Sequence, residues 1–210
     1  MTIQYKQLKE IEKELLKGIS IKKLEDEFNT ITGVYTATTG INIICVAVTI
    51  DYKTKEKIET EFKIVVEELP YNPNFIPFRE GPVIIETLKS LKIEPELIIV
   101  AGYGTINKYK LGVASYVGLM LKKPTISVSI KLNYGIIKNN DVYFKEEIRG
   151  KILKTKEFAN PIFISPGHNI DINTSLDITK EISTGVKLPI PLFLAHKKII
   201  KLRDEINNKI

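Results

Sequence analysis

Hydrophobic positions follow two different periods along this chain, and the changes between them predict the order of its elements. Residues 7–28 place apolar side chains at helical spacing among charged ones, which predicts an amphipathic helix. Three stretches rich in β-branched residues follow, separated by short turns, over 30–38, 41–52 and 55–67. The first part of the chain is therefore expected to be a helix and an antiparallel meander.

The next part of the chain has the pattern of strands that alternate with helices. Residues 78–91 have helical spacing, and residues 97–100 are continuously apolar, as in a strand covered on both faces. A helix over 110–121 and a strand over 125–130 complete a β-α-β unit, whose strands are parallel. The last elements expected are a hairpin or extra strands and two helices, over 134–164, 173–183 and 191–208.

This order predicts an α/β fold with a ribonuclease H-like mixed β-sheet flanked by helices. A chain of 210 residues, 43% of them hydrophobic, is expected to bury one core, so residues 1–210 are predicted to form a single domain. No apolar run reaches the roughly 20 residues that a bilayer requires, and the N-terminus is charged rather than signal-like. We therefore expect a cytoplasmic protein with no membrane partner.

Composition adds little to this picture. The net charge of +6 mildly favours a polyanionic partner such as DNA or RNA. Abundant Ile and Lys, with no Trp and two Met, are typical of thermophiles and also of AT-rich genomes. The lone Cys45 lies in an apolar run, which favours a buried thiol without chemistry. The sequence does not predict an oligomeric state.

The distribution of acidic residues restricts the chemistry more sharply. No Asp or Glu occurs in residues 28–50 or in residues 97–140, which include the first meander strand and the whole β-α-β unit. Hydrolytic sites that use Mg²⁺ need several carboxylates on neighbouring elements. The two stretches predicted to form the centre of the sheet therefore supply none.

Four segments, in order, resemble the endonuclease V family of repair nucleases, which act on deoxyinosine in DNA and, in some members, on inosine in RNA. They are PYNP at 70–73 with FREGP at 78–82, the stretch from PELIIV to LGVAS at 95–115, SPGH at 165–168, and LPIP with LAH at 188–196. The resemblance covers nearly the whole chain and implies the ribonuclease H-like fold.

The resemblance implies a site in which acidic residues hold Mg²⁺ against the scissile phosphate. Glu80 and His196 keep the residues of the family. Tyr35 and Ala101 occupy positions where the family has Asp, and Asn107 occupies a position where it has His. Because a neutral phenol and a methyl group do not bind magnesium, no metal is expected and nuclease activity is predicted to be lost.

The resemblance also implies contacts with nucleic acid. Tyr71 and Pro73 match a wedge loop that enters the duplex beside a flipped base. Gly102, Gly104 and Gly112 would let main-chain amides approach that base. A proline-stiffened surface loop is the alternative for the first pair, and a tight strand-to-helix turn for Gly102 and Gly104.

Two further residues complete the predicted nucleic-acid contacts. His168 lies in a segment that the family uses near the nucleic-acid backbone, and the alternative is a structured turn at the edge of the sheet. Lys131 lies one residue after Ile130, which occupies the place of a family Lys. Lysines around 197–203 would add sequence-neutral phosphate contacts, or would be solvated helix faces.

Three functions therefore stay open. The favoured one is an inactive family member that retains binding to nucleic acid or to a modified base such as inosine. The second is an active endonuclease V that uses Mg²⁺ in a site rebuilt from distant acids such as Asp51 or Asp171. The third is a non-enzymatic protein-interaction module, with Tyr35 and Tyr103 lining the former cleft.

Overall fold

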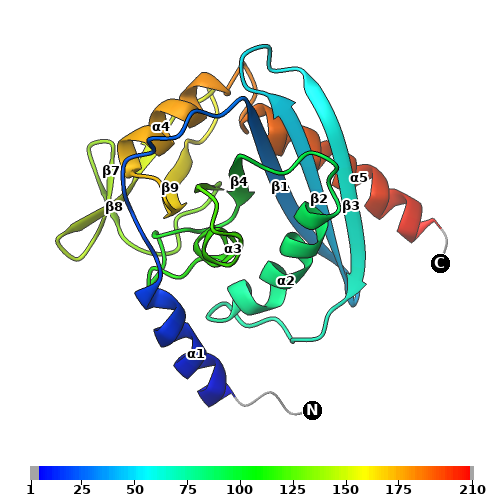
Figure 1. The fold of residues 1–210 in the computed structure, drawn as a ribbon, viewed down its shortest axis with the longest axis horizontal. Coiled ribbons are helices and arrows are strands. Elements are labelled where there is room, and N and C mark those ends of the chain that lie inside the picture. The colour runs from blue at the N-terminus through cyan, green and yellow to red at the C-terminus, as the bar shows by residue number, and fades with distance from the viewer. Residues whose placement is uncertain (1–4, 209–210) are drawn as a thin grey trace.

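A mixed β-sheet forms the centre of the computed structural model, which describes residues 5–208 (Figure 1). The strand order is β3-β2-β1-β4-β5-β9-β8-β7-β6. The strands are β1 (Thr30–Thr39), β2 (Asn42–Asp51), β3 (Lys57–Val66), β4 (Leu97–Ala101), β5 (Thr125–Ser129), β6 (Ile136–Lys138), β7 (Asp141–Phe144), β8 (Glu147–Leu153) and β9 (Ile162–His168). Strands β1, β4 and β5 are parallel to one another, and the other pairings are antiparallel. The predicted α/β architecture is confirmed.

Helices cover both faces of this sheet (Figure 1). On one face lie α2 (Ile76–Lys89) and α3 (Val113–Leu121), and on the other lie α4 (Ile172–Glu181) and α5 (Ile190–Asn207). Side chains of β2 alternate between the two cores, so nearly the whole strand is buried. This explains why its sequence is a continuous apolar run rather than an alternating one. Helix α1 (Tyr5–Lys17) lies at the lower side of the molecule in Figure 1, where the ring of Tyr5 stacks on that of Phe75 with centroids 5.1 Å apart.

Two predictions about local structure were wrong. The first helix ends at Lys17 instead of continuing to residue 28, because Gly18 follows it and packs against Leu119. The segment 165–168 is part of the buried strand β9 rather than a turn at the sheet edge. Pro166 pairs with Ile126, where the β5–β9 ladder changes register, and such an irregularity is a position at which a strand tolerates proline.

A smaller prediction, the buried thiol, agrees with the structure. Cys45 is fully buried, and burial raises the pKa of its thiol to about 12. Asp171 is the N-cap of α4, and its carboxylate accepts hydrogen bonds from the N–H groups of Asn173 and Thr174. No helix in the described part of the chain is both long and apolar enough to cross a membrane.

The contact between β1 and α5 fixes the position of the last helix and gives a stability prediction. A Cβ added to Gly33 would lie 2.6 Å from the Cβ of Pro191. Gly33→Ala is therefore expected to lower the free energy of unfolding by roughly 1–3 kcal/mol, measured by urea denaturation. Gly40→Ala is the control: Gly40 has a φ of 55° but no neighbour within 4 Å, so only backbone strain of about 1 kcal/mol is expected. Equal losses in both variants would contradict the packing argument.

Candidate functional site

The register of two parallel strands brings the key positions together. Val34 of β1 pairs with Val100 of β4, so Tyr35 and Ala101 follow at the same level on neighbouring strands. Both belong to the face of the sheet covered by α5. The resemblance assigned two carboxylates to these positions, and the structure places a phenol and a methyl group there.

Tyr35 packs against His196 of α5, the histidine that matches the family resemblance. The rings of Tyr35 and His196 lie 4.9 Å apart, centroid to centroid, and are tilted by 49°. Burial raises the pKa of Tyr35, which keeps the phenol neutral at physiological pH. The position of the first family carboxylate is therefore filled by an uncharged aromatic contact.

Glu80, the retained carboxylate, is already engaged within the protein. Its Oε2 accepts a hydrogen bond of 2.7 Å from Thr36 Oγ1, and its Oε1 lies 3.5 Å from Arg79 Nη1. The side chain of Arg79 is 3% exposed, and its guanidinium also pairs with Glu67 and donates to Thr38. Burial raises the pKa of Glu80, an effect that the Thr36 hydrogen bond and the Arg79 charge partly oppose. Thr36 and a buried arginine therefore share this carboxylate.

These residues do not fit a magnesium ion, which requires several oxygen ligands of negative charge. Glu80 is the one carboxylate among the family positions, and a cation already lies beside it. Across residues 5–208, no group of three or more His, Cys, Asp or Glu side chains is arranged to hold a metal.

The two distant acids considered for a rebuilt site lie at the other end of the central strands, where β1 begins and β9 ends. Asp51 pairs with Thr30, the first residue of β1, roughly 16 Å along the strand from Tyr35. Its Oδ1 accepts from the N–H groups of the turn that follows. Asp171 caps α4 beyond the end of β9, which pairs with the start of β5. Neither acid approaches Ala101.

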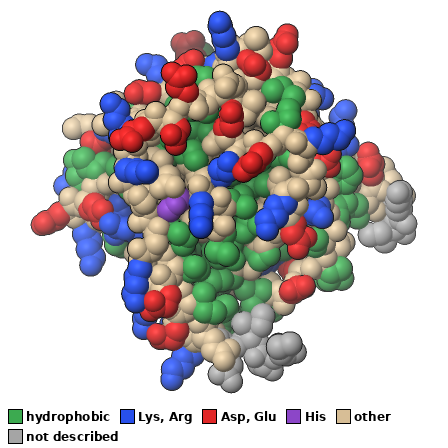
Figure 2. Space-filling view, viewed as in Figure 1, with side chains coloured by type: hydrophobic (Ala, Val, Ile, Leu, Met, Phe, Trp, Pro, Cys, Tyr) green, Lys and Arg blue, Asp and Glu red, His purple; other side chains and the backbone are tan. Residues whose placement is uncertain are grey.

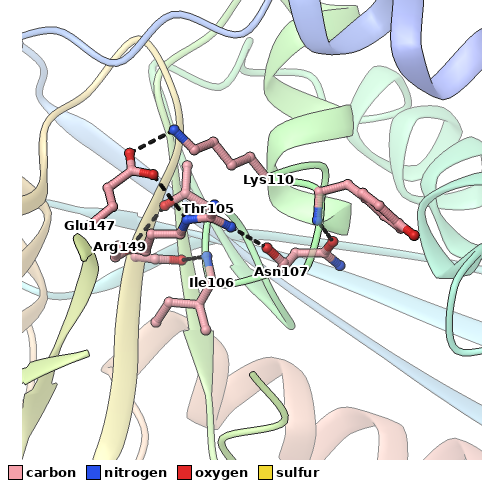
Figure 3. A network of polar contacts seen from close by, with 8 residues as sticks. Thr105, Ile106, Asn107, Lys110, Glu147 and Arg149 are labelled. Carbon is pink, nitrogen blue, oxygen red and sulfur yellow. Dashed lines mark hydrogen bonds and ion pairs between the residues drawn. The ribbon is translucent and has the colours of Figure 1, made fainter. Parts of the chain in front are cut away.

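The loop that carries Asn107 is fixed by a polar network to β8 and β9 (Figure 3). Thr105 Oγ1 donates to the Arg149 carbonyl (3.0 Å), and Arg149 Nη1 donates to the Asn107 carbonyl (2.6 Å). Glu147 pairs with Lys110 (2.6 Å) and with Arg149 (3.3 Å). The Asn107 side chain accepts a hydrogen bond from the N–H of Tyr109, so it stabilises the loop itself. Sequence reasoning missed Arg149 as part of this loop, because its partners Thr105 and Asn107 are distant along the chain.

The three glycines of this loop have packing and backbone roles. The N–H groups of Gly102 and Gly112 donate to the carbonyls of Val128 and Gly104, so these two amides do not face a ligand. A Cβ on Gly112 would lie 2.0 Å from the Tyr103 carbonyl oxygen, and one on Gly104 would lie 2.3 Å from a β9 carbonyl. The strand-to-helix turn, which was the alternative for Gly102 and Gly104, agrees with these contacts.

Tyr103 and Lys131 lie just beyond the C-terminal ends of β4 and β5. The Tyr103 hydroxyl donates to the Lys131 carbonyl (2.8 Å), and burial raises the pKa of Tyr103. The phenols of Tyr134 and Tyr71 add to this rise in the pKa of Tyr103. Lys131 comes after the end of β5, in a turn closed by Ser129, and its side chain is exposed.

The predicted wedge loop presents its tyrosine to solvent. Tyr71 is 69% exposed, and the Arg79 guanidinium carbon lies 5.9 Å from its ring centroid. Asn72 closes the loop through two hydrogen bonds, from the N–H groups of Asn74 and Phe75. Pro73, inside this turn, is exposed as well. The loop is therefore an ordered support for an exposed aromatic ring near the same edge.

Comparisons with known proteins agree on one family. The family model for endonuclease V matches residues 13–197. The endonuclease V of Dictyoglomus turgidum is 36% identical over 200 residues, which cover 91% of this chain and 88% of that protein. This chain belongs to the endonuclease V family.

Solved structures of this family have the same fold. A crystal structure of endonuclease V from Bacillus subtilis has a TM-score of 0.89 and 29% identity, and the match covers 99% of this chain and 95% of that one. Ciona intestinalis endonuclease V, in complex with a DNA that contains an inosine followed by a ribo-adenosine, has a TM-score of 0.87 and 21% identity and covers 98% and 99%. The ribonuclease H-like prediction is confirmed.

His168 lies apart from the other candidate residues of this endonuclease V family member. It pairs with Thr125, the first residue of β5, and is 5% exposed. Its Nδ1 accepts a hydrogen bond of 3.2 Å from the N–H of Ser20, and burial lowers its pKa. His168 therefore bonds to the segment after α1, and its burial leaves little of the ring accessible to a ligand.

The environment of Glu80 predicts how stability changes with pH. A carboxyl whose pKa is raised on folding binds its proton more tightly in the folded state, so ionising it destabilises the protein. The free energy of unfolding of Glu80→Gln, relative to the wild type, is therefore expected to increase as pH rises from about 4 to about 7. Urea denaturation at several pH values measures this difference. Glu86→Gln, on an exposed position of the same helix, is the control, and a pH-independent difference for Glu80→Gln would contradict the argument.

Proposed function

We propose that this chain is an endonuclease V family protein that has lost metal-dependent phosphodiester hydrolysis and binds nucleic acid at the edge formed by β1, β4 and β5. The carrying observation is the parallel register that puts Tyr35 and Ala101 side by side. These are the two positions at which the family resemblance requires carboxylates. Their replacement leaves Glu80 as the one acid of the set.

Electrostatics support the loss of hydrolysis. A magnesium ion loses bound water on entering a protein site and needs anionic oxygens in exchange. Here the remaining carboxylate would have to release Thr36 and overcome the repulsion between the incoming ion and the buried guanidinium of Arg79. Both requirements weaken the binding of a cation at the position where catalysis would need it.

Nucleic-acid binding is supported by features of this chain and by one relative. The Ciona intestinalis protein, which has the same fold, is bound to DNA that contains inosine. In this chain the exposed ring of Tyr71 offers a stacking surface, and the exposed side chain of Lys131 offers a phosphate contact. We infer that the ligand is DNA or RNA, with an inosine-bearing strand as the first to test.

The loss of hydrolysis predicts no cleavage by the purified protein. Inosine-containing DNA and RNA, incubated with Mg²⁺ or Mn²⁺, are expected to remain intact on a denaturing gel, because too few carboxylates meet at this edge. Metal-dependent nicking that disappears in Glu80→Ala would show that the proposal is wrong.

Restoring the carboxylates gives a positive counterpart. Tyr35→Asp/Ala101→Asp is expected to bind Mn²⁺ in calorimetric titrations in which the wild type shows no binding, since three acids would then converge. Thermal unfolding of the double variant without metal controls for its fold. Equal Mn²⁺ binding by both proteins would contradict the account of the site.

The wedge loop predicts a defined loss of binding. Tyr71→Ala is expected to weaken binding of an inosine-containing strand about tenfold, because stacking of one base on an aromatic ring contributes about 1–3 kcal/mol. Fluorescence anisotropy with a labelled oligonucleotide measures the dissociation constant. The control is Ile93→Ala, an exposed apolar side chain on the connection between α2 and β4. Unchanged affinity in Tyr71→Ala would remove this residue from the proposed interface.

A further inference from the structure

A groove with a strongly basic rim runs between α5 and the edge strand β3, on the face of the sheet away from α2. Its volume is about 410 Å³. The floor is apolar and the rim is formed by lysines; the lining residues are Val48, Lys57, Thr60, Phe62, Leu194, Lys197, Lys198 and Lys201. No acidic residue lines it, and no acid within residues 5–208 forms an ion pair with any of the four lysines.

The alternation of β3 separates the charges. Thr60 and Phe62 pair with β2 residues whose side chains lie in the core beneath α5. The acids of β3 take the alternate positions and point to the other face, where Glu59 accepts hydrogen bonds from the N–H groups of Lys92 and Ile93. That face, seen in Figure 2 over α2 and α3, mixes Lys and Arg with Asp and Glu. The groove beside α5 is therefore lined by cations alone among its charged residues, whereas the face shown in Figure 2 carries both signs of charge.

An aromatic ring lies among these cations. Phe62 is 43% exposed although it is a large apolar side chain, and Lys198 Nζ lies 5.3 Å from its ring centroid. Cations together with an exposed aromatic surface are the combination used to hold single-stranded nucleic acid: the cations contact phosphates and the ring contacts a base.

The groove begins beside the candidate site. His196, whose ring packs on Tyr35, immediately precedes Lys197 on α5. Lys197 and Lys201 are four residues apart on one side of the helix, roughly 6 Å along its axis, or about two nucleotides of rise in one strand. Phe62 in the groove pairs with Val46, which in turn pairs with Tyr35, so the groove and Tyr35 lie at the same level of the sheet, two strands apart.

We propose that this groove binds the phosphodiester backbone of the nucleic-acid strand that the candidate site contacts, an inference that rests on the proposed function. A second copy of the chain is a poor occupant, because symmetric contact would place four lysines against four lysines. The shared chemistry of DNA and RNA is the phosphodiester, and separate DNA and RNA probes distinguish the two.

The test compares two matched lysine pairs. Lys197→Gln/Lys201→Gln removes two charges from the groove, and Lys89→Gln/Lys92→Gln removes two exposed charges from α2 and the turn after it. Labelled single strands of about 16 nucleotides, as DNA and as RNA, are titrated by anisotropy between about 50 and 200 mM salt. The groove pair is expected to weaken binding tenfold or more. It should also make the slope of log K against log salt shallower by about 1.4, while the control pair leaves both unchanged.

Four results would overturn the inference, and they separate it from the proposed function. Equal weakening by the two pairs would mean that net charge alone governs binding. Weakening by Tyr71→Ala without weakening by the groove pair would remove the groove and leave the cleft as the binding site. No binding of either strand by the wild type at low salt would remove both proposals. Polyglutamate that competes as well as an oligonucleotide of equal charge would assign the groove to acidic proteins instead.

Discussion

The parallel pairing of β1 with β4 is the constraint on which the rest of this molecule depends. It fixes which residues stand side by side at the sheet edge, and Gly33 then allows α5 to pack closely on β1. Two carboxylates in register at Tyr35 and Ala101 would repel each other and would require a cation to neutralise them. With a phenol and a methyl group there, the edge is stable without an ion.

The arrangement around Glu80 follows from the same change. An isolated buried carboxylate is costly, and here the charge of Arg79 and the hydroxyl of Thr36 compensate for its desolvation. Arg79 in turn needs Glu67, because its side chain is almost fully buried. Glu80 is thus part of a structural network that includes Arg79 in the first turns of α2.

Sequence periodicity was sufficient for the order of strands and helices, because burial on one or both faces leaves a direct pattern in the residues. It failed at residues 18–28 and 165–168. There the outcome depends on partners far along the chain: Ser20 bonds to His168, and the register change of β9 accommodates Pro166. Dependence on distant partners also explains why the neighbouring positions in the site could be predicted from the sequence but the orientation of individual groups could not. Adjacency of Tyr35 and Ala101 follows from strand order, but which face a glycine amide or a histidine ring presents depends on tertiary contacts.

The loss of acids also changes how a phosphate can approach this edge. In a hydrolytic site the carboxylates that hold the metal repel the nucleic-acid backbone whenever the metal is absent. Here one carboxylate remains and lies beside a guanidinium, while Lys131 after β5 and Lys197 and Lys201 on α5 are exposed cations. Under the proposed function, phosphates would meet cations whose charge does not depend on a bound ion, which is the electrostatic condition for binding without cleavage.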